Sequence, residues 1–167
     1  MIGFYVGNST PAYLQRNYDN MAQTNTPKIG VFVGSFNPFH KGHLNVLEKA
    51  SDVFDKIIVA TGKNSDKEGV ERIEFDSSCI DKYEIQSYDG LLIDFLKTFE
   101  HPVTLIRGIR SGDDVAYESN LANVLRDLNG GIPINIHYIM CDREYAHISS
   151  TVVRELKKHN ITNLYSI

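Results

Sequence analysis

The sequence contains only two cysteines, Cys79 and Cys141, and no long apolar run. Neither cysteine belongs to a Cys-x-x-Cys or Cys/His pattern, which excludes a disulfide framework and a structural zinc site and favours a reducing compartment. No window approaches the roughly 18 consecutive apolar residues of a membrane span. The first residues also lack the basic n-region and apolar core of a secretion signal. We therefore expect a cytoplasmic protein with no membrane partner.

Positive charge is also in the minority. The chain has 17 Lys+Arg against 21 Asp+Glu, a net charge of −4. Proteins that hold nucleic acid through phosphate contacts usually carry a positive excess, so no nucleic-acid partner is expected. The 167 residues, 42% of them apolar, suffice for one domain, and no internal repeat or low-complexity run divides them.

Short apolar segments alternate with helical patterns along most of the chain. Residues 1–27 are polar and predict an N-terminal extension with a short helix and a linker, and residues 28–167 predict the domain. Strands are expected at 29–33, 56–60, 83–88, 103–106 and 134–140. Helices are expected at 44–53, 91–99, 113–128 and 149–158. This alternation predicts an α/β fold with a doubly wound, five-stranded parallel sheet that binds its ligand at the carboxyl ends of the strands.

The segment after the first strand contains groups that suit an anion. It matches neither Gly-x-Gly-x-x-Gly nor Gly-x-x-x-x-Gly-Lys-Ser/Thr. His40 and His43 share one face of the expected first helical turn, beside backbone N–H groups without intrahelical partners. Gly42 leaves room for a ligand near the backbone. Two alternatives stay open: two ordinary surface histidines, or a zinc site, for which no third ligand lies nearby.

Hydroxyl residues begin the last expected helix. Ser149, Ser150 and Thr151 are three successive candidate caps, although one would suffice, and Arg154 lies one turn further on. Capping alone explains one hydroxyl; a bound phosphate chain would use the others together with the guanidinium.

Basic residues follow two other strands. Arg107 and Arg110 come after the fourth expected strand, and Lys63 and Lys67 come after the second. Each pair alone is typical of solvated surface charge. In a doubly wound sheet, however, the first and fourth strands are neighbours, so these segments and the two histidines meet around one crevice.

Such a crevice suits a polyphosphate. No Ser-His-Asp set or reactive cysteine offers a nucleophile, so a covalent enzyme intermediate is not expected. The residues favour direct in-line transfer from a nucleotide, in which the protein positions both reactants and stabilises charge on the phosphates. An acceptor that is itself a phosphate needs no general base.

Two motifs resemble a known superfamily. His40-Lys41-Gly42-His43 and the segment 148–154 have the His-x-Gly-His and Ile-Ser-Ser-Thr-x-x-Arg patterns of nucleotidylyltransferases. The segments 34–43, 89–92 and 106–110, with the acidic residues that follow, resemble more narrowly the phosphopantetheine adenylyltransferases, over about residues 28–159. That resemblance implies a Rossmann-like fold of nucleotidylyltransferase type. It also implies coenzyme A biosynthesis: ATP and 4′-phosphopantetheine give dephospho-CoA and pyrophosphate, with Mg²⁺ bound through the ATP phosphates.

The resemblance also implies roles for individual residues. It assigns catalysis to His43, Lys67 and Arg107. It implies ATP binding by Ser35, Phe36, His40, His43, Gly108, Arg110, Glu118, Tyr145, Ile148, Ser149, Ser150, Thr151 and Arg154. It implies contacts with the acceptor by Ser35, Lys67, Leu92 and Arg107. Members of the family form homo-oligomers, hexamers in particular, so the same assembly is expected.

Several positions depart from the family pattern. Asn37 stands where Asp is usual, His40 where Thr is more common, and Ala146-His147 where Ser-Phe is common. The stretch between Lys67 and Tyr83 is shorter than usual, and in the family this stretch helps to shape the side of the site that binds the acceptor. Two other functions therefore stay open: a related nucleotidylyltransferase acting on nicotinamide mononucleotide or glycerol phosphate, and a non-catalytic nucleotide- or CoA-binding protein.

Overall fold

The computed structural model describes residues 27–63 and 80–167. In chain order the elements are β1 (Ile29–Val33), α2 (Lys41–Ser51), β2 (Lys56–Lys63), β3 (Glu84–Asp89), α4 (Leu92–Leu96), β4 (Val103–Ile109), α5 (Gly112–Leu128), β5 (Ile136–Met140) and α6 (Ser150–Lys158). The expected N-terminal helix and Lys67 lie outside the described residues. Within 27–63 and 80–167, no helix has the length and apolarity needed to cross a bilayer.

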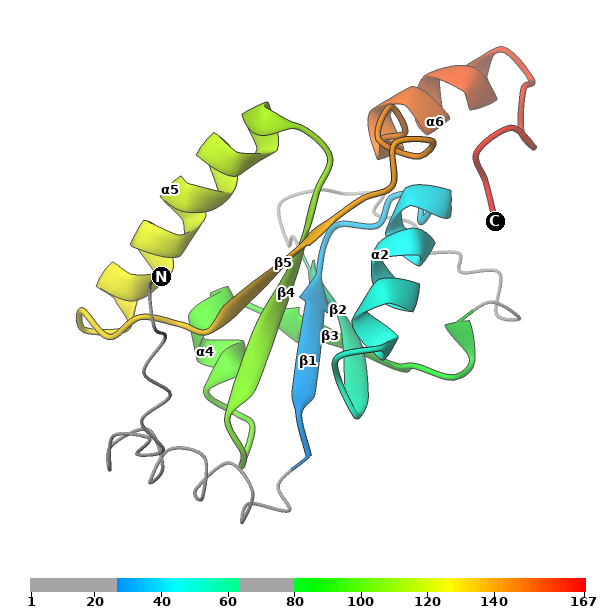
Figure 1. The fold of residues 1–167 in the computed structure, drawn as a ribbon. Coiled ribbons are helices and arrows are strands. Elements are labelled where there is room, and N and C mark those ends of the chain that lie inside the picture. Colours follow the sequence, from blue (N-terminus) through cyan, green and yellow to red (C-terminus); the bar gives the residue numbers. More distant parts are fainter. Residues whose placement is uncertain (1–26, 64–79) are drawn as a thin grey trace, which may run out of the picture.

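The strands form one parallel sheet of five, in the order β3-β2-β1-β4-β5 (Figure 1). The chain builds outward from β1 to β3 and then returns to place β4 on the other side of β1. The winding therefore reverses between β1 and β4, where the two adjacent crossovers diverge and leave a crevice. The predicted fold class and the predicted neighbourhood of the first and fourth strands are confirmed.

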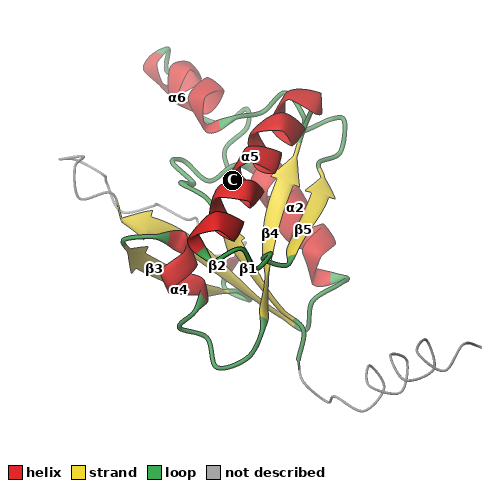
Figure 2. Cartoon of the chain, turned by 90° about the vertical axis from the view of Figure 1, so that its left-hand side faces the viewer, coloured by secondary structure: helices red, strands yellow, loops and turns green. Residues whose placement is uncertain are grey.

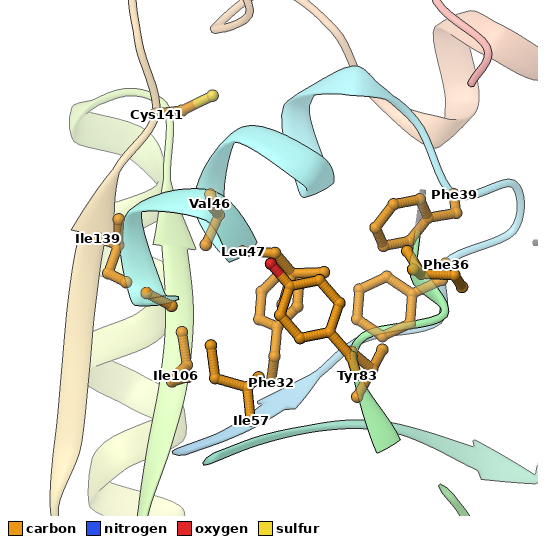
Figure 3. Packing of buried hydrophobic residues seen from close by; sticks show 13 residues of the cluster. Phe32, Phe36, Phe39, Val46, Leu47, Ile57, Tyr83, Ile106, Ile139 and Cys141 are labelled. Atoms are coloured by element: carbon orange, nitrogen blue, oxygen red, sulfur yellow. The ribbon is translucent and has the colours of Figure 1, made fainter. Parts of the chain in front are cut away.

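Helices cover both faces of the sheet because successive apolar side chains of a strand point in opposite directions. Phe32 and Ile106 belong to the core cluster under α2, which Figure 3 shows in close-up. Val31 and Leu105 belong to the cluster under α4 and α5, on the face that Figure 2 presents. Packing at β1 is so close that a Cβ on Gly30 would lie 2.5 Å from the Ile106 side chain.

Two strands run further than the sequence pattern predicts. β4 continues through Ile109, so Arg107 and Gly108 lie in the strand and not in a loop after it, because β4 is interior and pairs with β5 as far as Met140. β2 continues to Lys63, where it pairs with Asp89 of β3. Backbone pairing with a neighbouring strand extends both elements past the end of their apolar side chains, and only the tertiary structure supplies that partner.

Candidate active site

A pocket of about 290 Å³ opens at the carboxyl ends of β1 and β4. The loop after β1, the start of α2, the end of β4, the first turns of α5 and the start of α6 surround it, and Figure 1 shows these segments gathered at one edge of the sheet. The predicted site residues that line the pocket are Ser35, Phe36, His40, His43, Arg107, Gly108, Arg110, Glu118, Ser149 and Ser150. The crevice predicted from the winding of the chain thus exists in the structure.

The two histidines form a stacked pair at the start of α2. His40 is the N-cap residue, and its ring lies 3.6 Å from that of His43, centroid to centroid. The backbone N–H of His40 donates to Nδ1 of His43 at 3.3 Å. Because Nδ1 accepts this hydrogen bond, the proton of a neutral His43 resides on Nε2. His43 can therefore donate a hydrogen bond from Nε2 to a ligand in the pocket.

Burial keeps both imidazoles neutral. Desolvation, followed by the charge of Arg110, lowers the pKa of His40 from 6.5 to about 4. Desolvation, then the neighbouring His40 and Arg110, holds the pKa of His43 well below its ordinary value. The ring of His43 is enclosed by Phe36, which packs edge-on at 5.0 Å, and by Phe39 at 5.2 Å. At neutral pH the pair thus supplies hydrogen-bond donors without positive charge.

We predict that His40 makes the fold sensitive to acid. Its folded-state pKa lies below its unfolded value, so the unfolded chain binds more protons between the two, and stability falls as pH drops from 6.5 toward 4. Those two pKa values give a loss of about 2 kcal/mol of unfolding free energy at pH 5 from His40 alone. His40→Thr replaces the imidazole at the N-cap with a hydroxyl that can cap the helix, and it should flatten the pH dependence of the urea unfolding free energy.

The control for this prediction is His101→Asn, at an exposed position away from the pocket. An His40→Thr protein that loses as much stability between pH 7.5 and pH 5 as the His101→Asn protein would contradict it.

Arg107, which is partly buried, and the buried Glu118 form a bidentate ion pair in the lining of the pocket. Arg107 Nε donates to one carboxylate oxygen of Glu118 at 2.8 Å, and Nη2 donates to the other at 2.6 Å. Nη1 donates to the backbone carbonyl of Val33 at 2.7 Å, which ties β4 to the end of β1. Two of the five guanidinium N–H groups remain for a ligand. The Glu118 carboxylate is occupied by Arg107, so it orients the guanidinium.

Arg110 forms a second arginine–carboxylate pair at the rim. Its Nε and Nη2 donate to Asp114 at 3.0 and 2.9 Å, and the Arg110 backbone N–H also donates to Asp114, at 2.7 Å. These bonds hold the pKa of the Asp114 carboxyl below its ordinary value. Nη1 reaches the carbonyl of Ile148 at 3.4 Å, which connects the rim of β4 to the segment before α6.

The hydroxyls at the start of α6 have three different partners. Ser149 caps the helix by accepting from the N–H of Val152 at 3.2 Å. Ser150 donates to the carbonyl of Pro38 at 3.0 Å. Thr151 accepts from Nη2 of Arg154 at 3.1 Å, while the other terminal nitrogen of Arg154 donates to the Asn37 carbonyl. Ser149 thus acts as the cap, while Ser150 and the Arg154 guanidinium, which Thr151 helps to hold, connect α6 to the loop after β1.

Of the predicted site residues that the structure describes, five are not among those that line the pocket: Leu92, Tyr145, Ile148, Thr151 and Arg154. Ile148 is buried, and Tyr145 is partly buried against the core cluster of α2. Leu92 is the first residue of α4 and packs against the core cluster on the opposite face of the sheet. Gly108 does line the pocket, where a Cβ would lie 3.0 Å from Val46 of α2.

Comparison with known proteins identifies the family. The family model described as cytidylyltransferase-like matches residues 31–156. A phosphopantetheine adenylyltransferase of Clostridium perfringens is 36% identical over 140 residues, which are 80% of this chain and 84% of that protein. One of Levilactobacillus brevis is 36% identical over 137 residues, covering 78% of this chain and 83% of that protein. The chain belongs to the phosphopantetheine adenylyltransferase family.

Solved structures agree on the fold. A bifunctional NMN adenylyltransferase/ADP ribose pyrophosphatase from Francisella tularensis superposes with a TM-score of 0.52 at 16% identity. The match covers 81% of this chain and 43% of that chain, so this chain spans less than half of the bifunctional protein. At this identity the likeness supports the Rossmann-like architecture alone.

Three polar residues of the lining were absent from the predicted set. Asp114 and Tyr117 lie on the first turns of α5, and Cys141 directly follows β5. The spacing of Asp114 four residues after Arg110 is a signal for an ion pair that the sequence contains. The position of Cys141 at the carboxyl end of a strand is a second signal, although burial raises the pKa of its thiol and makes it a poor nucleophile.

Proposed function

We propose that this protein transfers the adenylyl group of ATP to 4′-phosphopantetheine, giving dephospho-CoA and pyrophosphate. The observation that supports this most strongly is the convergence of His43, Arg107 and the start of α6 on one pocket. This convergence occurs in a chain 36% identical to curated phosphopantetheine adenylyltransferases. The family membership favours phosphopantetheine over nicotinamide mononucleotide or glycerol phosphate as the acceptor.

In this mechanism the acceptor phosphate attacks the α-phosphorus of ATP in line with the leaving group. An oxygen–phosphorus bond forms to the acceptor, the bond between the α-phosphorus and the bridging oxygen breaks, and pyrophosphate leaves. The acceptor oxygen is already ionised at neutral pH, so no general base is needed. The neutral His43 donates from Nε2 to the oxygen on which negative charge develops.

Arg107 holds the acceptor phosphate in this scheme. Its guanidinium is fixed by Glu118 and by the carbonyl of Val33, so the two remaining N–H groups are preorganised. Ser35, which lines the pocket, and Lys67, which lies outside the described residues, complete the proposed phosphate contacts.

Mg²⁺ would be bound through the phosphates of ATP. The two pocket carboxylates, Asp114 and Glu118, are both occupied by arginines. Residues 27–63 and 80–167 contain no group of three or more His, Cys, Asp or Glu side chains placed to hold a metal. Phosphate oxygens and water are ligands that Mg²⁺ accepts readily, and the ion would offset charge on the pyrophosphate.

We also propose a cytoplasmic homo-oligomer, a hexamer as in the family. The exposed side of α5 supports an assembly, because Val124 and Leu128 are exposed there one helical turn apart. Light scattering on the purified protein measures the mass that decides between monomer and hexamer.

Acceptor choice is the direct test of the proposed reaction. Purified protein with ATP and Mg²⁺ should release pyrophosphate only when 4′-phosphopantetheine is present. We expect kcat/KM with nicotinamide mononucleotide or glycerol phosphate to be lower by about 10³-fold or more. A site whose polar groups pair with one acceptor leaves some of those groups unpaired when a different acceptor binds.

Faster turnover with either alternative acceptor would replace the proposed substrate. Tight binding of CoA without any turnover would instead indicate a non-catalytic binder.

A further inference from the structure

The last residues of the chain return from α6 to the start of α2. Figure 1 shows this segment, in red, running back toward that helix. The carbonyl of Tyr165 accepts from the backbone N–H of Lys41 at 3.2 Å, and the carbonyl of Leu164 accepts from the Lys41 ammonium at 3.2 Å. Ile167 packs against the core cluster beneath α2. The segment is thus docked by both hydrogen bonds and apolar contact.

Tyr165 also contacts the segment before α6. Its hydroxyl lies 3.0 Å from Nε2 of His147, and the two rings meet edge to face at 5.2 Å. His147 directly precedes the buried Ile148, whose carbonyl accepts from Arg110. Tyr165 therefore contacts both the start of α2 and the segment that precedes α6.

The backbone carbonyl and the side-chain hydroxyl of Tyr165 hold different segments beside the pocket. The Lys41 N–H, one of the donors that a helix leaves without intrahelical partners, is satisfied by Tyr165. Lys41 lies between His40 and His43, so the tyrosine carbonyl fixes the backbone that aims both imidazoles. The tyrosine hydroxyl in turn fixes His147.

We infer that Tyr165 is a positioning residue for nucleotide binding. Through His147, Tyr165 holds the 145–151 segment in place beside the start of α2. The inference rests on the proposed use of that segment for ATP. His147 supplies the ring nitrogen that pairs with the tyrosine hydroxyl.

Steady-state kinetics on Tyr165→Phe test the inference. The variant keeps the ring and the backbone contact with Lys41 and loses only the hydroxyl on His147. We expect KM for ATP to rise about threefold to tenfold, the effect of one neutral hydrogen bond, with kcat and KM for phosphopantetheine unchanged. An unchanged KM for ATP, or equal losses for both substrates, would overturn the inference.

A double-mutant cycle with His147→Phe tests whether Tyr165 acts on ATP binding through His147. If Tyr165 acts through His147, then Tyr165→Phe should have no further effect on KM for ATP in the His147→Phe protein. Additive effects in the cycle would overturn the inference.

Calorimetric titration with ATP separates this inference from the proposed reaction. Weaker ATP binding by Tyr165→Phe than by the unmodified protein supports the positioning role, whichever acceptor the enzyme uses. Equal affinity, or no ATP binding by either protein, overturns it.

Discussion

Replacing His43 with alanine is expected to lower kcat for pyrophosphate release by about 100-fold to 1,000-fold, the usual effect of removing one preorganised donor to transition-state charge. The backbone N–H of His40 fixes the tautomer of His43, and the surrounding aromatic rings fix its orientation, so the donor needs no reorganisation during the reaction. KM for ATP should change much less, since the donor acts on charge that develops only in the transition state.

The matched control is His101→Ala, which removes an exposed imidazole away from the pocket. Circular dichroism and the unfolding temperature should show that both variants are folded. A His43→Ala protein whose kcat stays within tenfold of the unmodified enzyme would remove His43 from the proposed catalytic role.

Replacing Arg107 with alanine is expected to affect both stability and acceptor binding. The Glu118 carboxylate is buried and both its oxygens accept from Arg107, so the substitution leaves a buried charge without its partner. Breaking such a pair from one side typically costs about 3–5 kcal/mol of unfolding free energy. The same substitution removes the N–H groups proposed to hold the acceptor phosphate.

The double variant Arg107→Met/Glu118→Gln separates the two effects. It removes both charges, so most of the lost stability should return, as measured by urea unfolding. KM for phosphopantetheine should nevertheless stay about 10-fold to 100-fold above that of the unmodified protein, because no guanidinium holds the phosphate.

Arg126→Ala, at an exposed position on the last turn of α5, should leave both measurements near their original values. A double variant with normal KM for phosphopantetheine would show that Arg107 has only a structural role.

The placement of the strands was predictable because their apolar runs are short and bounded by turn residues. β1 begins and ends where expected. Two glycines follow α5, and they adopt the left-handed conformation that commonly ends a helix, with φ of 69° at Gly130 and 84° at Gly131. The ends of β2 and β4 were not predictable, because pairing with β3 and β5 extends them.

The candidate site was predictable to the level of segments. The sequence places His43, Arg107 and Ser149 near the ends of strands, and parallel winding brings such positions to one edge. Which side chains are free to hold a ligand was not predictable. The sequence assigns Glu118 to ATP, whereas its carboxylate is bonded to Arg107, a contact between β4 and α5 that no spacing rule indicates.

By itself, therefore, the sequence determined the α/β class, the switch point between β1 and β4, and the residue types at the carboxyl edge, because periodicity and motif spacing are local properties. The tertiary structure decided the protonation of the two histidines, the pairing of Arg107 with Glu118 and the docking of Tyr165 on His147. Each of these features depends on burial or on a contact between different elements of the fold. A local sequence pattern determines neither burial nor such contacts.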